Sequence, residues 1–138
     1  GNDYVQSAMY TKGVTCASCH DVHGTAYNAD LIKPAQQLCL TCHGPNSPNG
    51  PRGTTIEAHT KHQSTSRGSD CVECHMPKIE PTIANINVRS HTFKFITPAM
   101  SSTHKIPNPC IVCHTSQTNE WATAQLKNWP GVSPWRVQ

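Results

Sequence analysis

The 138-residue sequence has few of the side chains that fill the core of an ordinary small domain. Val, Ile, Leu and Phe together account for about 16% of the residues, and so low a content favours disorder in a chain of high net charge. The formal net charge is only +3. Small domains with so little apolar material generally depend on disulfides, metals or cofactors. The sequence therefore predicts that something other than aliphatic side chains fills its centre.

Long apolar runs and a strong charge imbalance are missing as well. No stretch approaches the roughly 20 apolar residues that are needed to cross a bilayer, and no leader opens the chain at Gly1. We therefore expect no transmembrane segment, and an export signal that has already been removed. Because the net charge is small, we expect no basic patch and no nucleic-acid partner.

All eight cysteines fall in pairs two residues apart, and a histidine follows each pair at once. The four motifs are Cys16-Ala-Ser-Cys19-His20, Cys39-Leu-Thr-Cys42-His43, Cys71-Val-Glu-Cys74-His75 and Cys110-Ile-Val-Cys113-His114. C-x-x-C-H is the attachment motif of c-type haem. The two cysteines form thioethers to one porphyrin, and the adjacent histidine becomes the fifth ligand of the iron. The sequence thus predicts four covalent haems c, bound by the eight cysteines, with the four motif histidines as proximal ligands.

Two alternatives use the same cysteines, namely two four-cysteine zinc sites or four disulfides. Zinc sites of this kind have no need of a histidine after each pair, and disulfides place no demand on histidine at all. Haem accounts for both residue types, and its flat apolar faces supply the missing core. Without haem we expect the chain to be largely unfolded.

Loops dominate the predicted fold, since eleven prolines and eight glycines interrupt the chain, most densely over 44–53. We expect a mostly irregular fold with a few short α-helices, organised around its cofactors as a single tetrahaem domain over residues 1–138. Predicted helices run from Asp3 through Tyr10, from Pro34 to Gly44, from Thr55 through His62 and over 118–129. A weak strand pattern covers 83–88, with no evident partner strand.

Four irons have eight axial positions, and five histidines remain after the proximal four: His23, His59, His62, His91 and His104. This number allows two histidines at every iron with one to spare. His23 follows His20 by three residues, so it cannot reach the far face of the same haem. It serves a neighbour, for which the iron at His43 is the natural recipient, or it is a surface residue.

The other four histidines differ in where they lie in the sequence. His59 and His62 stand three residues apart and share a face if they lie on one helix, so a single turn offers imidazoles to two haems. His91 is the only histidine between His75 and His104. His104 lies close before the fourth motif. We expect Trp121, Trp129, Phe93 and Phe95 to pack on haem faces.

The stretch from Tyr4 to Trp129 resembles the four-haem module of bacterial multihaem cytochromes with doubled CxxCH motifs. The matching pieces are 13–24, His59-x-x-His62, Cys71 through Pro77, Arg89-Ser90-His91-Thr92-Phe93, Pro107 through His114 and Glu120-Trp121-Ala122. The resemblance implies that His23, His59, His62 and His91 are the distal iron ligands. His104 has no counterpart there and is the spare histidine.

Electron transfer is the function that these sites favour. An iron that holds two histidines has no position left for a substrate, and the protein then controls spacing, water access and potential. An enzyme, such as a multihaem reductase, needs one open haem site, and the sequence has no C-x-x-C-K motif of the kind found in the related pentahaem nitrite reductases. We therefore predict that the protein is not an enzyme.

Haem is attached to this motif outside the cytoplasm, so we expect an exported protein, periplasmic or extracellular, with redox proteins or an extracellular acceptor as partners. The haem count also resembles that of subunits of extracellular cytochrome filaments. A homopolymer in which haems of successive copies form a nanowire is one prediction. A periplasmic electron shuttle is the alternative.

Overall fold

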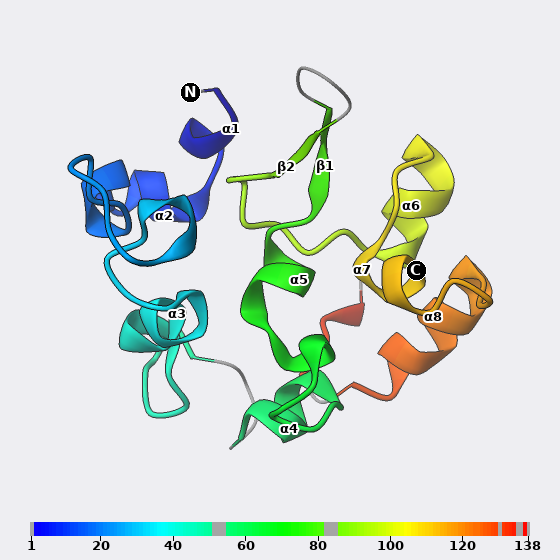
Figure 1. Cartoon of the computed structure of the whole chain (residues 1–138). Coiled ribbons are helices and arrows are strands. Elements are labelled where there is room, and N and C mark those ends of the chain that lie inside the picture. The colour runs from blue at the N-terminus through cyan, green and yellow to red at the C-terminus, as the bar shows by residue number, and fades with distance from the viewer. Residues whose placement is uncertain (1, 51–54, 82–85, 130, 135–136, 138) are drawn as a thin grey trace.

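The computed structural model describes residues 2–50, 55–81, 86–129, 131–134 and 137. Short helices joined by loops make up most of it (Figure 1). The α-helices are α1 (Asn2–Val5), α2 (Ala8–Thr11), α3 (Ala35–His43), α4 (Ile56–Thr60), α5 (Cys71–His75), α6 (Pro98–His104), α7 (Pro109–Cys113) and α8 (Asn119–Lys127). Three 3-10 helices cover Cys16–Ser18, Asn28–Asp30 and Arg67–Ser69. The predicted fold class is confirmed, although the helices outnumber the four predicted.

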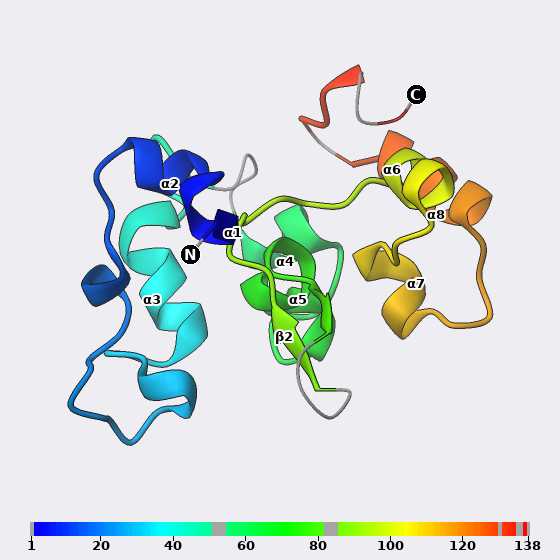
Figure 2. The same cartoon turned by 90° about the horizontal axis from the view of Figure 1, so that it is seen from above.

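The helices lie in three groups along one direction. Figures 1 and 2 place α1, α2 and α3 on one side, α4, α5 and the strands in the middle, and α6, α7 and α8 on the other side. The middle group contacts both neighbours, because α5 packs against α3 and against α7. The chain therefore runs across the molecule in sequence order.

Each C-x-x-C-H motif lies on a helical turn, which brings its two cysteines to the same side. The first motif begins with the 3-10 helix Cys16–Ser18, the second ends α3, and the third and fourth form α5 and α7. Local residues start these turns. Pro34 precedes α3, and the Asn108 side chain accepts hydrogen bonds from the backbone N–H groups of Cys110 and Ile111.

Two of the predicted helices differ from the expectation. The segment from Asp3 to Tyr10 is broken into α1 and α2, because Ser7 adopts an extended conformation and its side chain caps α2 by accepting from the Tyr10 N–H. Thr55 caps α4 as predicted, but the helix ends at Thr60, since Lys61 adopts a left-handed conformation (φ 59°). The prediction that His62 shares a helical face with His59 is therefore wrong.

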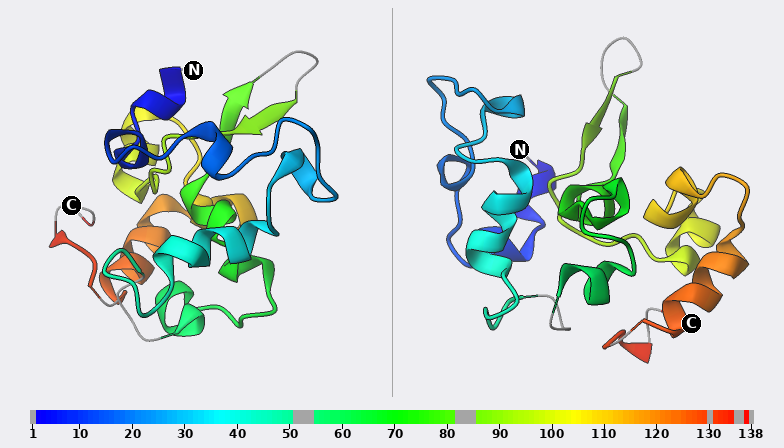
Figure 3. Two further views of the ribbon diagram at one scale, coloured as in Figure 1. Left: turned by 90° about the vertical axis from the view of Figure 1, so that its left-hand side faces the viewer. Right: turned by 60° about the horizontal axis from the view of Figure 1, so that its bottom comes forward.

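Two strands form an antiparallel hairpin that projects from the middle group (Figure 3). β1 (Lys78–Pro81) pairs with β2 (Asn87–Arg89), with Lys78 opposite Arg89 and Pro81 opposite Asn87. The weak strand pattern over 83–88 thus falls partly on β2, while residues 82–85 lie outside the described part. β1 was not predicted, and it is a strand of four residues that ends in a proline.

Among the described residues the hydrophobic core is very small. Its fully buried apolar side chains are Ile96, Ala122 and Leu126, all at the contact of α6 and α8 or beside it. Several large apolar side chains are exposed instead: Val5, Tyr10, Val22, Tyr27, Ile32, Ile86, Val88 and Val112. Such a distribution is unfavourable for a protein that folds on side-chain burial alone, and it fits a fold that is completed by bulky apolar cofactors.

Candidate haem sites

Three of the four motif histidines face a histidine from elsewhere in the chain. The ring centres of His20 and His91 are 6.2 Å apart, those of His75 and His59 are 6.3 Å apart, and those of His114 and His62 are 6.1 Å apart. The His59 and His75 rings are nearly parallel, with 8° between their planes. In each pair one ring belongs to a C-x-x-C-H motif and the other comes from a different segment.

This spacing suits an iron between the two rings. A bond from a metal to an imidazole nitrogen is about 2 Å long, and that nitrogen lies about 1.1 Å from the ring centre. Two imidazoles on opposite sides of one iron therefore have centres about 6 Å apart. All three observed separations agree with this value.

The second ring nitrogen of four histidines is held by a backbone carbonyl. Nδ1 of each ring donates to a carbonyl oxygen: His20 to Ala29 (2.7 Å), His43 to Asn49 (2.8 Å), His62 to Thr60 (2.6 Å) and His91 to Arg89 (3.0 Å). A carbonyl can only accept, so the proton is on Nδ1. The lone pair of Nε2 is then left for a metal, as is usual for histidine ligands.

Burial acts in the same direction at His59. It lowers the pKa of this imidazole below its usual value of 6.5, which favours the neutral form. A histidine binds a metal only as the neutral ring. The His59 imidazole is therefore suited to face the His75 ring across an iron.

The cysteines fit haem better than the two alternatives. None of the eight forms a disulfide. In the described part of the chain, no three His, Cys, Asp or Glu side chains gather in a way that could hold a metal ion. A zinc site draws four ligands from the protein, whereas a haem iron takes four from the porphyrin and needs only the two imidazoles seen in each pair.

Cysteines of successive motifs lie near one another. Burial raises the pKa of Cys19, and the nearby Cys39 and Cys42 thiols raise it further. A hydrogen bond joins the Cys39 and Cys71 thiols, and it raises the pKa of the first and lowers that of the second. The first three C-x-x-C-H turns therefore lie next to one another in a row.

The row continues to the fourth motif. Burial raises the pKa of Cys74 to about 11, and the neighbouring thiols of Cys110 and Cys113 contribute to the shift. Neighbouring attachment turns bring neighbouring porphyrins close. The motifs therefore succeed one another in space in the same order as in sequence.

Apolar surface is available for a porphyrin beside the first motif. A hollow of about 300 Å³ lies next to Cys16, lined also by Tyr4, Val5, Tyr10, Val14 and Thr15. Val5 and Tyr10 are among the exposed large apolar residues. A haem attached at Cys16 would cover them.

Aromatic side chains contact the paired imidazoles. Trp121 packs against His114 with 5.0 Å between ring centres, Phe95 lies 6.3 Å from His75, and Phe93 lies 5.8 Å from His91. The Trp129 indole N–H donates to the backbone carbonyl of His59. The four aromatic residues thus lie beside histidines that are predicted to bind iron, and their packing on haem faces stays a prediction.

The structure does not bring His23 and His43 together ring to ring. Both side chains are exposed, and within the described residues neither ring faces another histidine. The backbone N–H of His23 donates to Asp21, just before a turn at Gly24 (φ 87°). His104 is also exposed and ends α6.

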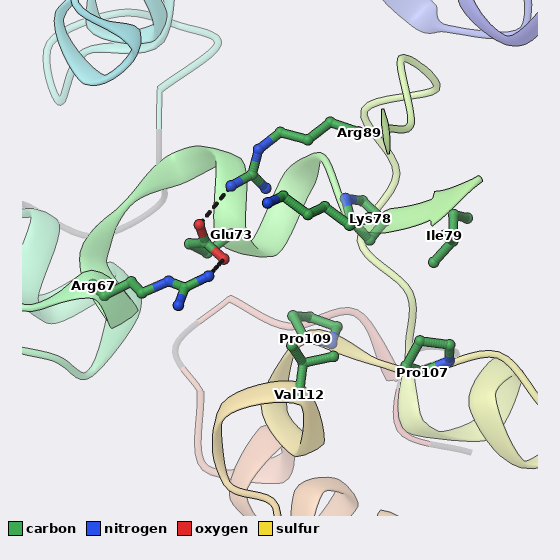
Figure 4. A pocket seen from close by; sticks show the side chains of 9 residues that line it. Arg67, Glu73, Lys78, Ile79, Arg89, Pro107, Pro109 and Val112 are labelled. Atoms are coloured by element: carbon green, nitrogen blue, oxygen red, sulfur yellow. Dashed lines mark hydrogen bonds and ion pairs between the residues drawn. The ribbon is translucent and has the colours of Figure 1, made fainter. Parts of the chain in front are cut away.

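A charged cluster that the sequence did not reveal supports the third motif. Nη1 of Arg89 donates to the backbone carbonyls of Val72 (2.8 Å) and Met76 (3.0 Å) at the end of α5, and Nη2 pairs with Glu73 at 2.5 Å. Arg67 pairs with the other oxygen of Glu73 at 3.2 Å, so that the carboxylate lies between two guanidinium groups (Figure 4). Burial would raise the pKa of Glu73, but the hydrogen bonds from Arg89 and Arg67 outweigh it and lower the pKa.

Paired imidazoles, cysteine pairs on helical turns and a small side-chain core are features typical of multihaem c-type cytochromes, which this chain resembles. Two comparisons with known proteins support this resemblance. Residues 8–48 match the family model of the doubled CXXCH motif, and no curated protein matches the sequence. The fold is similar to that in the crystal structure of the outer cell wall cytochrome OcwA, with a TM-score of 0.61 and 24% identity over 84% of this chain. The chain spans 26% of that protein.

The doubled motif indicates covalent haem c. Among the described residues, no helix is long and apolar enough to cross a membrane.

Proposed function

We propose that the protein transfers electrons through four covalently bound haems c, each with two histidines on its iron. The facing imidazoles carry this proposal. Three pairs of rings with centres 6.1–6.3 Å apart join each of the first, third and fourth motifs to a histidine outside the motif. The bound haems supply reversible one-electron chemistry at iron.

The residues of the chain have defined tasks in this function. The eight cysteines Cys16, Cys19, Cys39, Cys42, Cys71, Cys74, Cys110 and Cys113 attach the porphyrins. His20, His43, His75 and His114 are the proximal ligands, and His91, His59 and His62 are the distal ligands of the first, third and fourth irons. Backbone carbonyls hold four of these rings in a fixed tautomer, which lowers the reorganisation needed on a change of charge.

His23 is the proposed distal ligand at His43. It lies on a surface loop that no ring contact fixes, and it follows the first motif directly. The cysteines of the first two motifs are neighbours, which supports a short path from this loop to the second haem. His104 takes no part.

Saturation of every iron by two imidazoles leaves no position for a substrate, so the proposed role is that of an electron carrier and not of an enzyme. The row of attachment turns supports transfer from the first haem to the fourth. We place the protein in the periplasm or outside the cell, where it exchanges electrons with redox proteins or an extracellular acceptor. Copies that associate end to end would extend the row into a filament.

The test uses the purified native protein. The intact mass should exceed that of the polypeptide by four haems, with no free thiol. The ferric spectrum at neutral pH should be fully low spin, and reduction should give a sharp alpha band. A smaller mass increase would contradict the haem count, and a substantial high-spin fraction would favour the enzyme with an open haem site.

A further inference from the structure

The first iron is the one whose two histidines lie furthest apart in sequence, and the N-terminal helix connects them. His20 belongs to the first motif, while His91 follows the hairpin of the middle group. The two rings meet only if residues 90–93 are held against the first group of helices. The contacts of α1 show how this is done.

Asp3 holds residues 90–93 through hydrogen bonds to the His91 backbone and the Ser90 side chain. Its carboxylate accepts a hydrogen bond from the backbone N–H of His91, and both of its oxygens lie 3.1 Å from Oγ of Ser90. Ser90 is only 1% exposed. Its hydroxyl donates to Asp3 and accepts from the hydroxyl and the backbone N–H of Thr92, at 3.0 and 3.3 Å. One side chain of α1 thus satisfies both the buried Ser90 hydroxyl and the backbone N–H of His91.

Tyr4 holds the same segment through its ring. It lies edge to face against Phe93, with 6.4 Å between ring centres, and Phe93 in turn lies edge to face against His91 at 5.8 Å. Phe93 has a φ of 53°, which is a strained conformation for a large side chain and persists only where neighbours hold it. The Tyr4 hydroxyl donates to the carbonyl of Val14, two residues before Cys16. Tyr4 therefore bridges the attachment side and the distal side of the first site.

We propose that Asp3 and Tyr4 form a clamp that keeps the His91 imidazole over the first iron. This inference rests on the proposed function, because it assigns positioning residues to one of the proposed haem sites. Asp3 fixes the backbone of His91, Tyr4 fixes the strained Phe93 beside it, and Nδ1 of His91 is held by Arg89. Neither clamp residue is a proposed ligand of the iron. Their effect is on the fraction of molecules in which the distal ligand is bound.

The test compares holo proteins that carry Asp3→Ala, Asp3→Asn, Tyr4→Phe and the control Gln6→Ala. Gln6 is the matched control, because its side chain is exposed and, among the described residues, forms a hydrogen bond only to the backbone carbonyl of the nearby Asn2. We expect all four to contain the wild-type number of haems. Asp3→Ala should convert up to one iron per chain to ferric high spin, which should then bind cyanide, and Asp3→Asn should convert a smaller fraction because it keeps one acceptor oxygen. Tyr4→Phe keeps the ring contact with Phe93 but loses the bond to Val14, so it should convert a smaller fraction than Asp3→Ala does. Gln6→Ala should keep the wild-type spin state.

Two further variants separate positioning from a general loss of stability. His91→Ala should yield one high-spin iron, and adding Asp3→Ala to it should increase the high-spin count no further. A second high-spin iron in the double variant, or fully low-spin spectra for both Asp3 variants, would overturn the clamp. If Asp3→Ala does not mature, the Asp3→Asn protein decides the question. A wild-type protein without haem would instead refute the proposed function itself.

Discussion

Four of the histidines that we propose as iron ligands have Nδ1 held by a backbone carbonyl, and the surrounding backbone differs from site to site. His62 illustrates a strong support. Its Nδ1 donates to the carbonyl of Thr60 at 2.6 Å, and its backbone follows the left-handed residue Lys61 that ends α4. Among the described residues no partner holds the His104 ring, which lies exposed in the last turn of α6, where a histidine suits the negative end of the helix dipole.

Substitution of these two histidines should separate a ligand from a surface residue. His62→Ala should leave one iron per chain high spin, because no other imidazole faces His114. His104→Ala should leave the ferric spectrum unchanged. Electron paramagnetic resonance of the oxidised proteins measures both outcomes, and the opposite pattern would refute the assignment of His104 as the spare histidine.

Glu73 makes a pH-dependent contribution to stability. Its folded pKa is lowered below the usual 4.5, so the unfolded chain binds the proton more readily. The contribution is complete above pH 4.5 and is lost as the pH falls through the folded pKa. Glu73→Gln should therefore reduce the free energy of unfolding at pH 7 and flatten its decline below pH 4.5, measured by denaturant titrations at several pH values. An equally steep decline in both proteins would show that other carboxylates govern acid unfolding.

Helix starts and haem motifs could be read from the sequence, because residues a few positions apart control them. Pro34 precedes α3 and Thr55 caps α4, as predicted, and the helix predicted over 118–129 begins at Asn119 after its cap Thr118. The ends were harder to predict, since α8 stops at Lys127 and a left-handed Lys61 shortens α4. The sequence did not predict which motif histidine each of the other histidines faces. That choice depends on chain reversals, a short hairpin and side chains such as Asp3 that are remote in sequence.

Asn108 connects three helices around the fourth motif. The residue is fully buried, caps α7, and donates through Nδ2 to Oδ1 of Asn119 at 2.7 Å. Asn119 in turn donates to Oγ of Ser102 in α6 at 3.0 Å. A buried side chain with every group satisfied fixes the mutual positions of α6, α7 and α8.

Loss of the Asn108 side chain should lower the stability of the group formed by α6, α7 and α8. Asn108→Ala removes a helix cap and a buried hydrogen bond, so the free energy of unfolding should fall by about 2 kcal/mol. Asn108→Asp keeps the capping oxygen and should lose less. Denaturant unfolding of the ferric holo proteins, followed in the Soret band, gives both values. A loss under about 0.5 kcal/mol for the alanine variant would mean that the cap is dispensable.

At the scale of the molecule, the three groups of helices carry the four motifs in order, with the first in one outer group and the fourth in the other (Figure 2). A hydrogen bond joins Cys39 in the first group to Cys71 in the middle group, and the pKa of Cys74 in the middle group is raised in part by the nearby Cys110 and Cys113 thiols of the third. The polypeptide has a very small hydrophobic core, which consists of Ile96, Ala122 and Leu126 among its described residues. A row of cofactors is thus both the proposed electron path and the proposed core.

End-to-end association is the last prediction, and it concerns the two ends of this row. Val22 beside the first motif is 89% exposed, and Val112 in the fourth is 53% exposed. A head-to-tail contact between two different surfaces does not close on itself and therefore generates a filament. We expect electron micrographs of the native protein to show filaments. Val22→Lys and Val112→Lys should shorten or abolish them, whereas Ile86→Lys beside β2, on the projecting hairpin, should not. Uniform monomers of the wild-type protein at high concentration would exclude the filament and leave a periplasmic shuttle.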